Sequence, residues 1–331
     1  DYPLGFIRVR AKGKEPFIKE FLQNPPLPGG ASKAEGTQWI RTLREITLDR
    51  VEMSENLFKR MAENEVFEKI CIKNTDITSV PPFFFQQKHL EYLNLGCNGL
   101  KTLPKGTYDL PSVRTIDFSG NELTGAAFEG VSWSVDALEH LDLSENHIEK
   151  LFIPISHNKG RSPVLKTLNV AGNRLSGLPS AFNGVLDGLE ELNISWNRFG
   201  KIVPGIVNFE SVKIFLADGN ELNELPGELM HWGIEECSLS HNKFTKIPDC
   251  LLQAPLLKKL NLIHNGMTVR EPKPKLKWNN KSWGLKISKG NTVLPPRFFL
   301  AQLLIDLYSY TLAPIFQAIG SLFTYCCEMV Y

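Results

Sequence analysis

Residues 90–100 read LEYLNLGCNGL, and this stretch decides the fold. Leu90, Leu93, Leu95 and Leu100 occupy relative positions 1, 4, 6 and 11, and Asn98 occupies position 9. The alternation at positions 4 and 6 is typical of a short β-strand whose apolar side chains point into a core, so positions 3, 5 and 7 point outward. The segment therefore predicts a short strand that ends just before the asparagine.

The same template recurs along the chain at spacings of 22 to 27 residues. Eight units carry Asn at position 9, and they begin at Leu90, Val113, Leu138, Leu165, Leu189, Val212, Ile234 and Leu257. Two degenerate units precede them, beginning at Leu43 and Phe67, with Val51 and Thr75 in place of Asn. Self-similarity at this period predicts a stacked solenoid whose terminal units are atypical.

These ten units resemble the leucine-rich-repeat family over residues 41–267. Apolar-Pro steps such as Leu103-Pro104 and Ile247-Pro248, together with a period near 23 residues, are similar to the intracellular, typical class of that family. The resemblance implies an α/β horseshoe solenoid, with a parallel sheet on its concave side and short helical or irregular segments on its convex side. Proline after the apolar residue should prevent the strand from extending.

The position-9 asparagines have a structural role in this family. The resemblance implies that each turns inward and satisfies backbone groups of adjacent units, because a buried amide without partners costs about 1–3 kcal/mol. The expected ladder is Asn98, Asn121, Asn146, Asn173, Asn197, Asn220, Asn242 and Asn265.

Ligands of the family usually lie on the concave sheet, so the outward strand positions are candidates for protein binding. Ile214 and Leu216 are apolar at two outward positions of one unit, and Trp196 stands at position 8 of the preceding unit. Apolar and aromatic anchors carry most interface energy, although a locally shifted strand that buries the two aliphatic side chains explains the pattern equally well. The candidate protein-binding residues are Tyr92, Asp117, His140, Asp142, Glu191, Trp196, Ile214 and Leu216.

Motifs for catalysis or for cofactor binding are missing from the sequence. It has no His-x-x-x-His with a third ligand, no glycine-rich phosphate loop and no nucleophile elbow. Its 37 Lys and Arg nearly balance its 36 Asp and Glu, and no aromatic-basic interleaving marks a nucleic-acid surface. The sequence therefore predicts no enzyme, no catalytic residue, no cofactor, no metal ion and no nucleic-acid partner.

Both ends of the chain differ in composition from the repeats. Residues 1–40, with NPPLPGG at 24–30, predict an extended N-terminal arm. Residues 268–297 form a basic linker with eight positive side chains and one acid, and residues 155–163 predict a polar loop. Residues 298–331 predict a hydrophobic helical tail that inserts residues 298–327 into a lipid bilayer, or else a cap broken at Pro314 that covers the last unit.

Two functions fit these features. The first is a non-catalytic scaffold or accessory subunit, which docks protein subunits of a larger membrane-associated complex on its repeats. The start at Asp1 instead of Met fits an imported protein, so the mitochondrial inner membrane is expected, with the solenoid on the cytosolic or matrix side. The second is a soluble cytosolic regulator of a GTPase or phosphatase whose C-terminal helix caps the solenoid. An extracellular receptor fragment is disfavoured, because the six cysteines do not cluster at the repeat ends, where disulfide caps would be expected.

Overall fold

The computed structural model describes residues 8–12, 43–53, 55–62, 64–151, 165–178, 188–202, 210–267, 277–278 and 281–282. The chain divides into two compact units, Asp1–Gly266 and Met267–Tyr331. In the second unit, β14 (Lys277–Trp278) pairs antiparallel with β15 (Lys281–Ser282). The repeats belong to the first unit.

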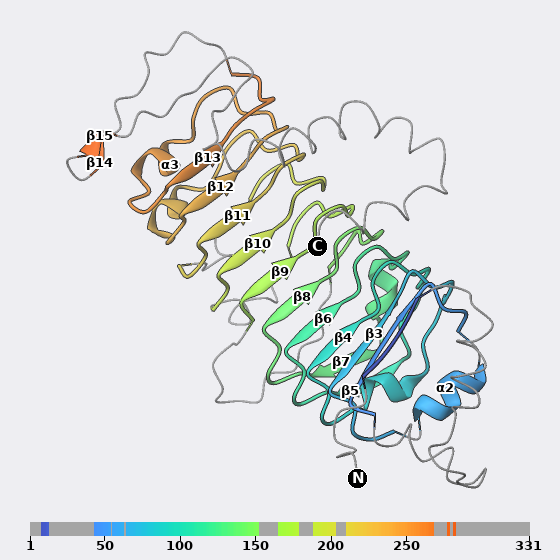
Figure 1. The fold of residues 1–331 in the computed structure, drawn as a ribbon. Helices are drawn as coiled ribbons and strands as arrows, with labels where there is room; N and C mark the ends of the chain where they lie inside the picture. The colour runs from blue at the N-terminus through green and yellow to red at the C-terminus, as the bar shows by residue number, and fades with distance from the viewer. Residues whose placement is uncertain are drawn as a thin grey trace, which may run out of the picture. The chain divides into compact units, whose positions relative to one another are not determined.

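Parallel strands make one side of the first unit, where they lie side by side in an eleven-stranded sheet (Figure 1). Their order in the sheet follows their order in the chain. The strands are β1 (Arg8–Lys12), β2 (Glu45–Asp49), β3 (Lys69–Lys73), β4 (Tyr92–Asn94), β6 (Thr115–Asp117), β8 (His140–Asp142), β9 (Thr167–Asn169), β10 (Glu191–Asn193), β11 (Ile214–Leu216), β12 (Glu236–Ser238) and β13 (Lys259–Asn261).

In this sheet, every strand after β1 begins at position 3 of one repeat unit. Within β4, β6 and β8 to β12 the middle residue is buried and its two neighbours are partly exposed. Identical positions pair between units, as Leu93 does with Ile116. The predicted solenoid with a parallel sheet is thus confirmed. Strand β1, from the segment predicted as an extended arm, pairs parallel with β2 and adds an eleventh strand.

Short helices and turns connect the strands on the opposite side of the core. They are α2 (Glu55–Ala62), η4 (Pro82–Phe85), η5 (Gly125–Phe128), η7 (Gly227–His231) and α3 (Asp249–Gln253). Pro226 and Pro248 immediately precede η7 and α3, so the proline steps do end the strand side of a unit. A small parallel sheet of β5 (Gly106–Asp109) and β7 (Val131–Ser134) was not expected from the sequence.

Aromatic side chains fill the core behind that small sheet. Tyr108 stacks on Phe85 with ring centroids 3.9 Å apart, and Trp133 packs edge-on against Phe118. All four side chains are buried. Large rings in a two-layer solenoid bury much apolar area in each unit, at about 25 cal/mol per Å².

The core is less complete at the last unit. Leu257, Leu260 and Leu262 are only partly buried, whereas their counterparts in preceding units are fully buried. Within the described part of the chain, no strand pairs with the outer edge of β13.

Several predicted segments lie outside the described residues. They are the loop at 155–163, the linker at 268–297 apart from β14 and β15, and the hydrophobic helix of residues 298–331. Among the described residues, no helix is both long enough and apolar enough to cross a membrane. The thiols of Cys71, Cys237 and Cys250 are buried.

Candidate functional site

We define the sheet face as the side chains at positions 3, 5 and 7 of the units, with position 8 along its border. The candidate binding residues lie on this face or at its border. Beneath its border, the position-9 asparagines form hydrogen bonds between units. Asn146 accepts a bond from the backbone N–H of Leu123 at 3.0 Å and donates to the carbonyls of Phe118 and Leu143 at 2.9 and 3.1 Å. Six others make the equivalent three bonds with their own neighbouring units: Asn121, Asn173, Asn197, Asn220, Asn242 and Asn265. Asn98 donates to the same kinds of carbonyl but accepts from the backbone N–H and the hydroxyl of Thr75, at position 9 of the preceding unit.

The residue before each asparagine has a left-handed backbone. Position 8 has φ between +53° and +65° in all ten units. These residues are Arg50, Asn74, Cys97, Gly120, Glu145, Gly172, Trp196, Gly219, His241 and His264. This conformation turns the chain so that position 9 faces inward, and it costs a non-glycine residue about 1–2 kcal/mol. The sequence carried a signal for it, because three of the eight asparagines follow glycine.

Position 5 is a row of polar side chains that bond to their own unit and to the next. Asp117 and Asp142 each accept bonds from the backbone N–H and the hydroxyl of the serine two residues later. Asn94 donates to Asp117 at 2.6 Å, and Asn169 donates to Asp142 at 2.9 Å. These two predicted binding residues therefore also hold the sheet together.

The donors around these aspartates are all neutral, so the carboxylate charges are not cancelled. Burial raises the pKa of Asp142, and hydrogen bonds from Ser144 and Asn169 partly oppose that shift. The pKa of Glu145 is likewise raised, first by burial and then by the charge of Asp142. Asp117, Asp142 and Glu145 thus place three carboxyl groups near the middle of the sheet face and its border.

The unit containing β11 breaks the polar row. Leu216 replaces Asn or Asp at position 5, and the carboxylate moves to position 7 as Asp218, which accepts bonds from Ser238 and Ser240 of the next unit at 2.6 Å. Ile214 and Leu216 stay in register with β10 and β12, and both are partly exposed while Phe215 between them is buried. A shifted strand that buries the two aliphatic side chains is thus wrong.

Position 3 contains paired side chains. The ammonium of Lys69 lies 4.5 Å from the centroid of the Tyr92 ring. His140 Nδ1 lies 2.8 Å from Thr167 Oγ1. The predicted binding residues fall into two groups on the sheet. One group lies on β4, β6 and β8 and consists of Tyr92, Asp117, His140 and Asp142. The other lies on or beside β10 and β11 and consists of Glu191, Trp196, Ile214 and Leu216.

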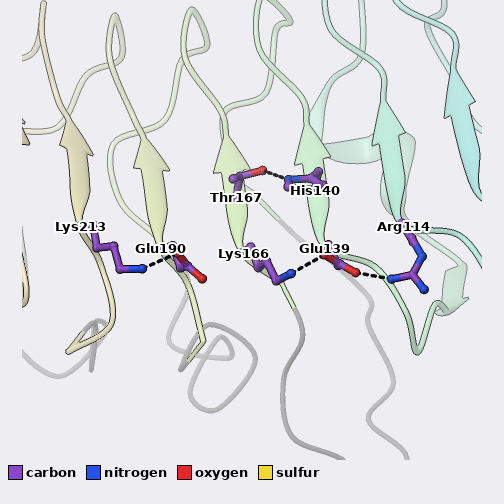
Figure 2. Close-up of polar contacts among 7 residues, drawn as sticks. All are labelled: Arg114, Glu139, His140, Lys166, Thr167, Glu190 and Lys213. Atoms are coloured by element: carbon purple, nitrogen blue, oxygen red, sulfur yellow. Dashed lines mark hydrogen bonds and ion pairs between the residues drawn. The ribbon is translucent and has the colours of Figure 1, made fainter.

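Position 2, just before each strand, carries a ladder of alternating charge that the sequence analysis missed. Figure 2 shows Glu139 between Arg114 and Lys166, and beside them the pair of Lys213 and Glu190. The Lys166 ammonium lies 2.5 Å from a Glu139 carboxylate oxygen, and the Lys213 ammonium lies 2.7 Å from Glu190. Lys258–Glu235 continues the ladder into the last unit, and Arg44–Glu68 is a further pair at position 2 that Glu91 separates from it. The signal was present in the repeat alignment, where position 2 alternates in sign from Arg114 to Lys258. Exposed pairs of this kind contribute about 0.2–1 kcal/mol each.

Trp196 is the most exposed of the candidate residues. Its side chain is 51% exposed, and its ring covers the backbone of Gly219 so closely that a Cβ there would overlap the indole. The ring centroid lies 5.5 Å from that of His241, which stacks on His264 at 4.3 Å. Three rings thus line the border of the sheet face across four units.

The described residues of the sheet face present polar and apolar side chains that can contact another surface. They contain no group of three or more His, Cys, Asp or Glu side chains that could hold a metal ion. Asp117 and Asp142 bond to neighbouring units, and Ile214 and Leu216 are partly exposed. This arrangement can bind another surface.

The family models match the repeat region. Two models described as leucine rich repeat match residues 68–123 and residues 137–158, 164–185 and 188–209. Receptor-like protein 9a of Arabidopsis thaliana is 31% identical over 203 residues, which are 52% of this chain and 21% of that protein. The first five curated relatives are matched over only 21–33% of their lengths.

Solved structures share the fold. The Leptospira interrogans LRR protein LIC12759 has a TM-score of 0.61 at 22% identity, covering 80% of this chain and 67% of that one. A chain of the LRIM1/APL1C complex has a TM-score of 0.52 at 25% identity, covering 69% of this chain and 41% of that one.

Proposed function

Since this chain is a leucine-rich-repeat protein, we propose that it is a non-catalytic scaffold that docks a partner protein on its sheet face. The observation that carries the proposal is the apolar group formed by the exposed Trp196 and the partly exposed Ile214 and Leu216. Apolar side chains at outward strand positions add nothing to the core, and similar anchors dominate protein interfaces. Complex formation by LRIM1, whose structure resembles this one, supports the same use of the fold.

Affinity purification of the full chain in mild detergent, compared with a Leu216→Asn variant, tests this proposal. Asn occupies position 5 in four other units, so the variant should fold normally while its sheet face loses an apolar anchor. The proposal predicts that partners recovered with the wild type are depleted with the variant. A matched control is Leu256→Ala, because Leu256 is 53% exposed but precedes β13 and lies off the sheet face.

The outcomes separate the alternatives. Equal recovery with wild type and Leu216→Asn, or recovery of chaperones alone, contradicts docking on the sheet face. Recovery of a GTPase or a phosphatase from the soluble fraction would favour the second function, a soluble regulator.

A finer part of the proposal concerns location. We propose that residues 298–327 hold the scaffold on an organelle membrane, with the mitochondrial inner membrane as the first candidate and the solenoid on the cytosolic or matrix side. The support is the sequence, in which 307–327 is an uncharged run of 21 residues that follows a basic segment. Carbonate extraction that released the full chain as readily as a version ending at Lys289 would contradict this membrane role.

A further inference from the structure

The ring row, defined here as Trp196, His241 and His264, is not required by the fold. Position 8 must adopt a left-handed backbone, for which glycine is the least costly residue, and the unit between Trp196 and His241 has Gly219 there. A position-8 side chain leaves the core, so core packing does not select it. The chain therefore bears the conformational cost of a tryptophan at a position where a neighbouring unit has glycine.

The indole of Trp196 is also held in place. Gly219 lets the ring lie flat along the next unit, and His241 packs against it at 5.5 Å between centroids. Stacking of His241 on His264 extends the same platform by another unit. An aromatic face that is fixed before binding loses little side-chain entropy when a ligand covers it.

Charge on the sheet face indicates what kind of ligand would cover that platform. Positions 3, 5, 7 and 8 of the eight units from Leu90 onward contain six carboxylates and one lysine, although the whole chain has a net charge of +1. The carboxylates are Asp117, Asp142, Glu145, Glu191, Asp218 and Glu236. The lysine, Lys259, is 2.7 Å from Glu236.

Only neutral donors bond to the aspartates, so their charge remains available to attract a cation. Asp218 receives its bonds from serine hydroxyls and a backbone N–H, and it stands at position 7 of the unit after Trp196. Glu191 begins the strand that leads to Trp196. An acidic ligand or a phosphate backbone would be repelled here.

We infer that the ring row and its surrounding carboxylates take a basic segment of the partner protein, with an arginine side chain stacked on Trp196. This inference rests on the proposed function and names the chemistry of its partner. A planar guanidinium stacks on indole and is only weakly hydrated, so arginine fits an aromatic platform beside carboxylates better than lysine does. The two imidazole rings of the row lengthen the stacking surface for neighbouring side chains of the segment.

Binding of labelled peptides to the full chain tests the inference. The probes are fluorescein-labelled Gly-Arg repeats, with Gly-Lys and Gly-Asp repeats of the same length, followed by anisotropy. The arginine peptide should bind most tightly and the aspartate peptide should not bind. Trp196→Gly should weaken arginine-peptide binding about fivefold, in line with a cation–π contact, and Trp196→Phe should restore part of it.

The variants are chosen so that a folding defect does not mimic the result. Trp196→Gly puts the least strained residue at a left-handed position, so the variant should unfold at the same or higher denaturant concentration than the wild type. Leu256→Ala removes the other large apolar side chain that is exposed among the described residues, and it should leave peptide binding unchanged. Glu191→Gln should weaken binding and reduce its salt dependence.

Two results would overturn the inference. One is equal affinity of the arginine and aspartate peptides for the wild type. The other is unchanged arginine-peptide affinity in Trp196→Gly. If in either case the Leu216→Asn variant still lost a co-purifying partner, docking on the sheet face would stand while the basic chemistry of the partner would not.

Discussion

Replacing Asn146 by alanine removes one rung of the asparagine ladder from the middle of the solenoid. Asn146 is only 3% exposed. Its side chain serves the Leu123 N–H and the carbonyls of Phe118 and Leu143, with all three distances between 2.9 and 3.1 Å. Alanine leaves these three backbone groups without that partner in the interior between two units.

The expected loss of stability follows from these three backbone groups. A buried donor or acceptor left unsatisfied costs about 1–3 kcal/mol, and the N–H of Leu123 should bear that cost in full because it has one proton to donate. The two carbonyls lose one of two lone-pair partners each, so they add less. We expect Asn146→Ala to lower the free energy of unfolding by about 2–4 kcal/mol.

Asn265 provides a comparison within the same chain. It makes the equivalent three bonds, to Phe244, Leu239 and Leu262, but it lies in the last unit and is partly exposed. Water can replace the lost side chain there, so Asn265→Ala should cost about 1 kcal/mol or less. Asn223→Ala, at an exposed position, is the surface control and should change the free energy of unfolding by no more than about 0.5 kcal/mol.

Urea unfolding followed by far-UV circular dichroism and by tryptophan fluorescence measures these differences. Repeat arrays can unfold in more than one step, so both probes and all their midpoints are compared. An Asn146→Ala variant within about 0.5 kcal/mol of the wild type would refute the reasoning. So would equal losses for Asn146→Ala and Asn265→Ala, because burial would then have no effect.

Three further predictions concern the surface of the solenoid. Gly219→Ala should lower the free energy of unfolding by about 1–2 kcal/mol, because φ is +62° there and the new Cβ meets the Trp196 ring. Asp142→Asn should become more stable relative to the wild type as the pH rises above 3.8, the ordinary pKa of the carboxyl. Burial raises the pKa of Asp142, so the folded wild type holds its proton more tightly than the unfolded chain and loses stability through this interval. Glu139→Gln should cost about 0.5–1 kcal/mol at low salt, because it breaks contacts with two cations, and less in about 1 M salt.

Each of these predictions has its own check. Gly200→Ala, with no atom within 4 Å of the new Cβ, is the matched control for Gly219→Ala, and equal effects of the two would contradict the ring contact. A stability difference between Asp142→Asn and wild type that is the same at every pH would contradict the raised pKa. A loss for Glu139→Gln that is unaffected by salt would show that the charge ladder acts through packing.

The repeat template predicts the positions of the strands because core burial leaves a periodic trace. Leu93 and its counterparts must be apolar in every unit, so aligning the units places each strand. Strand β1 could not be found in this way, since RVRAK at 8–12 lacks the template and is ordered by pairing with β2. The pairing of β5 with β7 was not predicted either, because it depends on the stacking of Tyr108 and Trp133 from neighbouring units.

The sheet face was predictable only in part. Outward positions follow from the strand alternation, so Ile214 and Leu216 were placed on it. Which polar groups bond to one another depends on neighbours about 20 to 27 residues away, as with Asp218 and Ser240 or Glu139 and Lys166. The left-handed backbone at Trp196, which sets the direction of its ring, follows from the turn before Asn197 and not from the identity of the tryptophan itself.

Hydroxyl-radical footprinting of the chain bound to its co-purified partner tests the central claim most directly. The account predicts that oxidation of Trp196 and Leu216, on the sheet face, falls on binding, while that of exposed Leu256 stays as in the free chain. Protection of Leu256 with Trp196 as reactive as in the free chain would contradict docking on the sheet face.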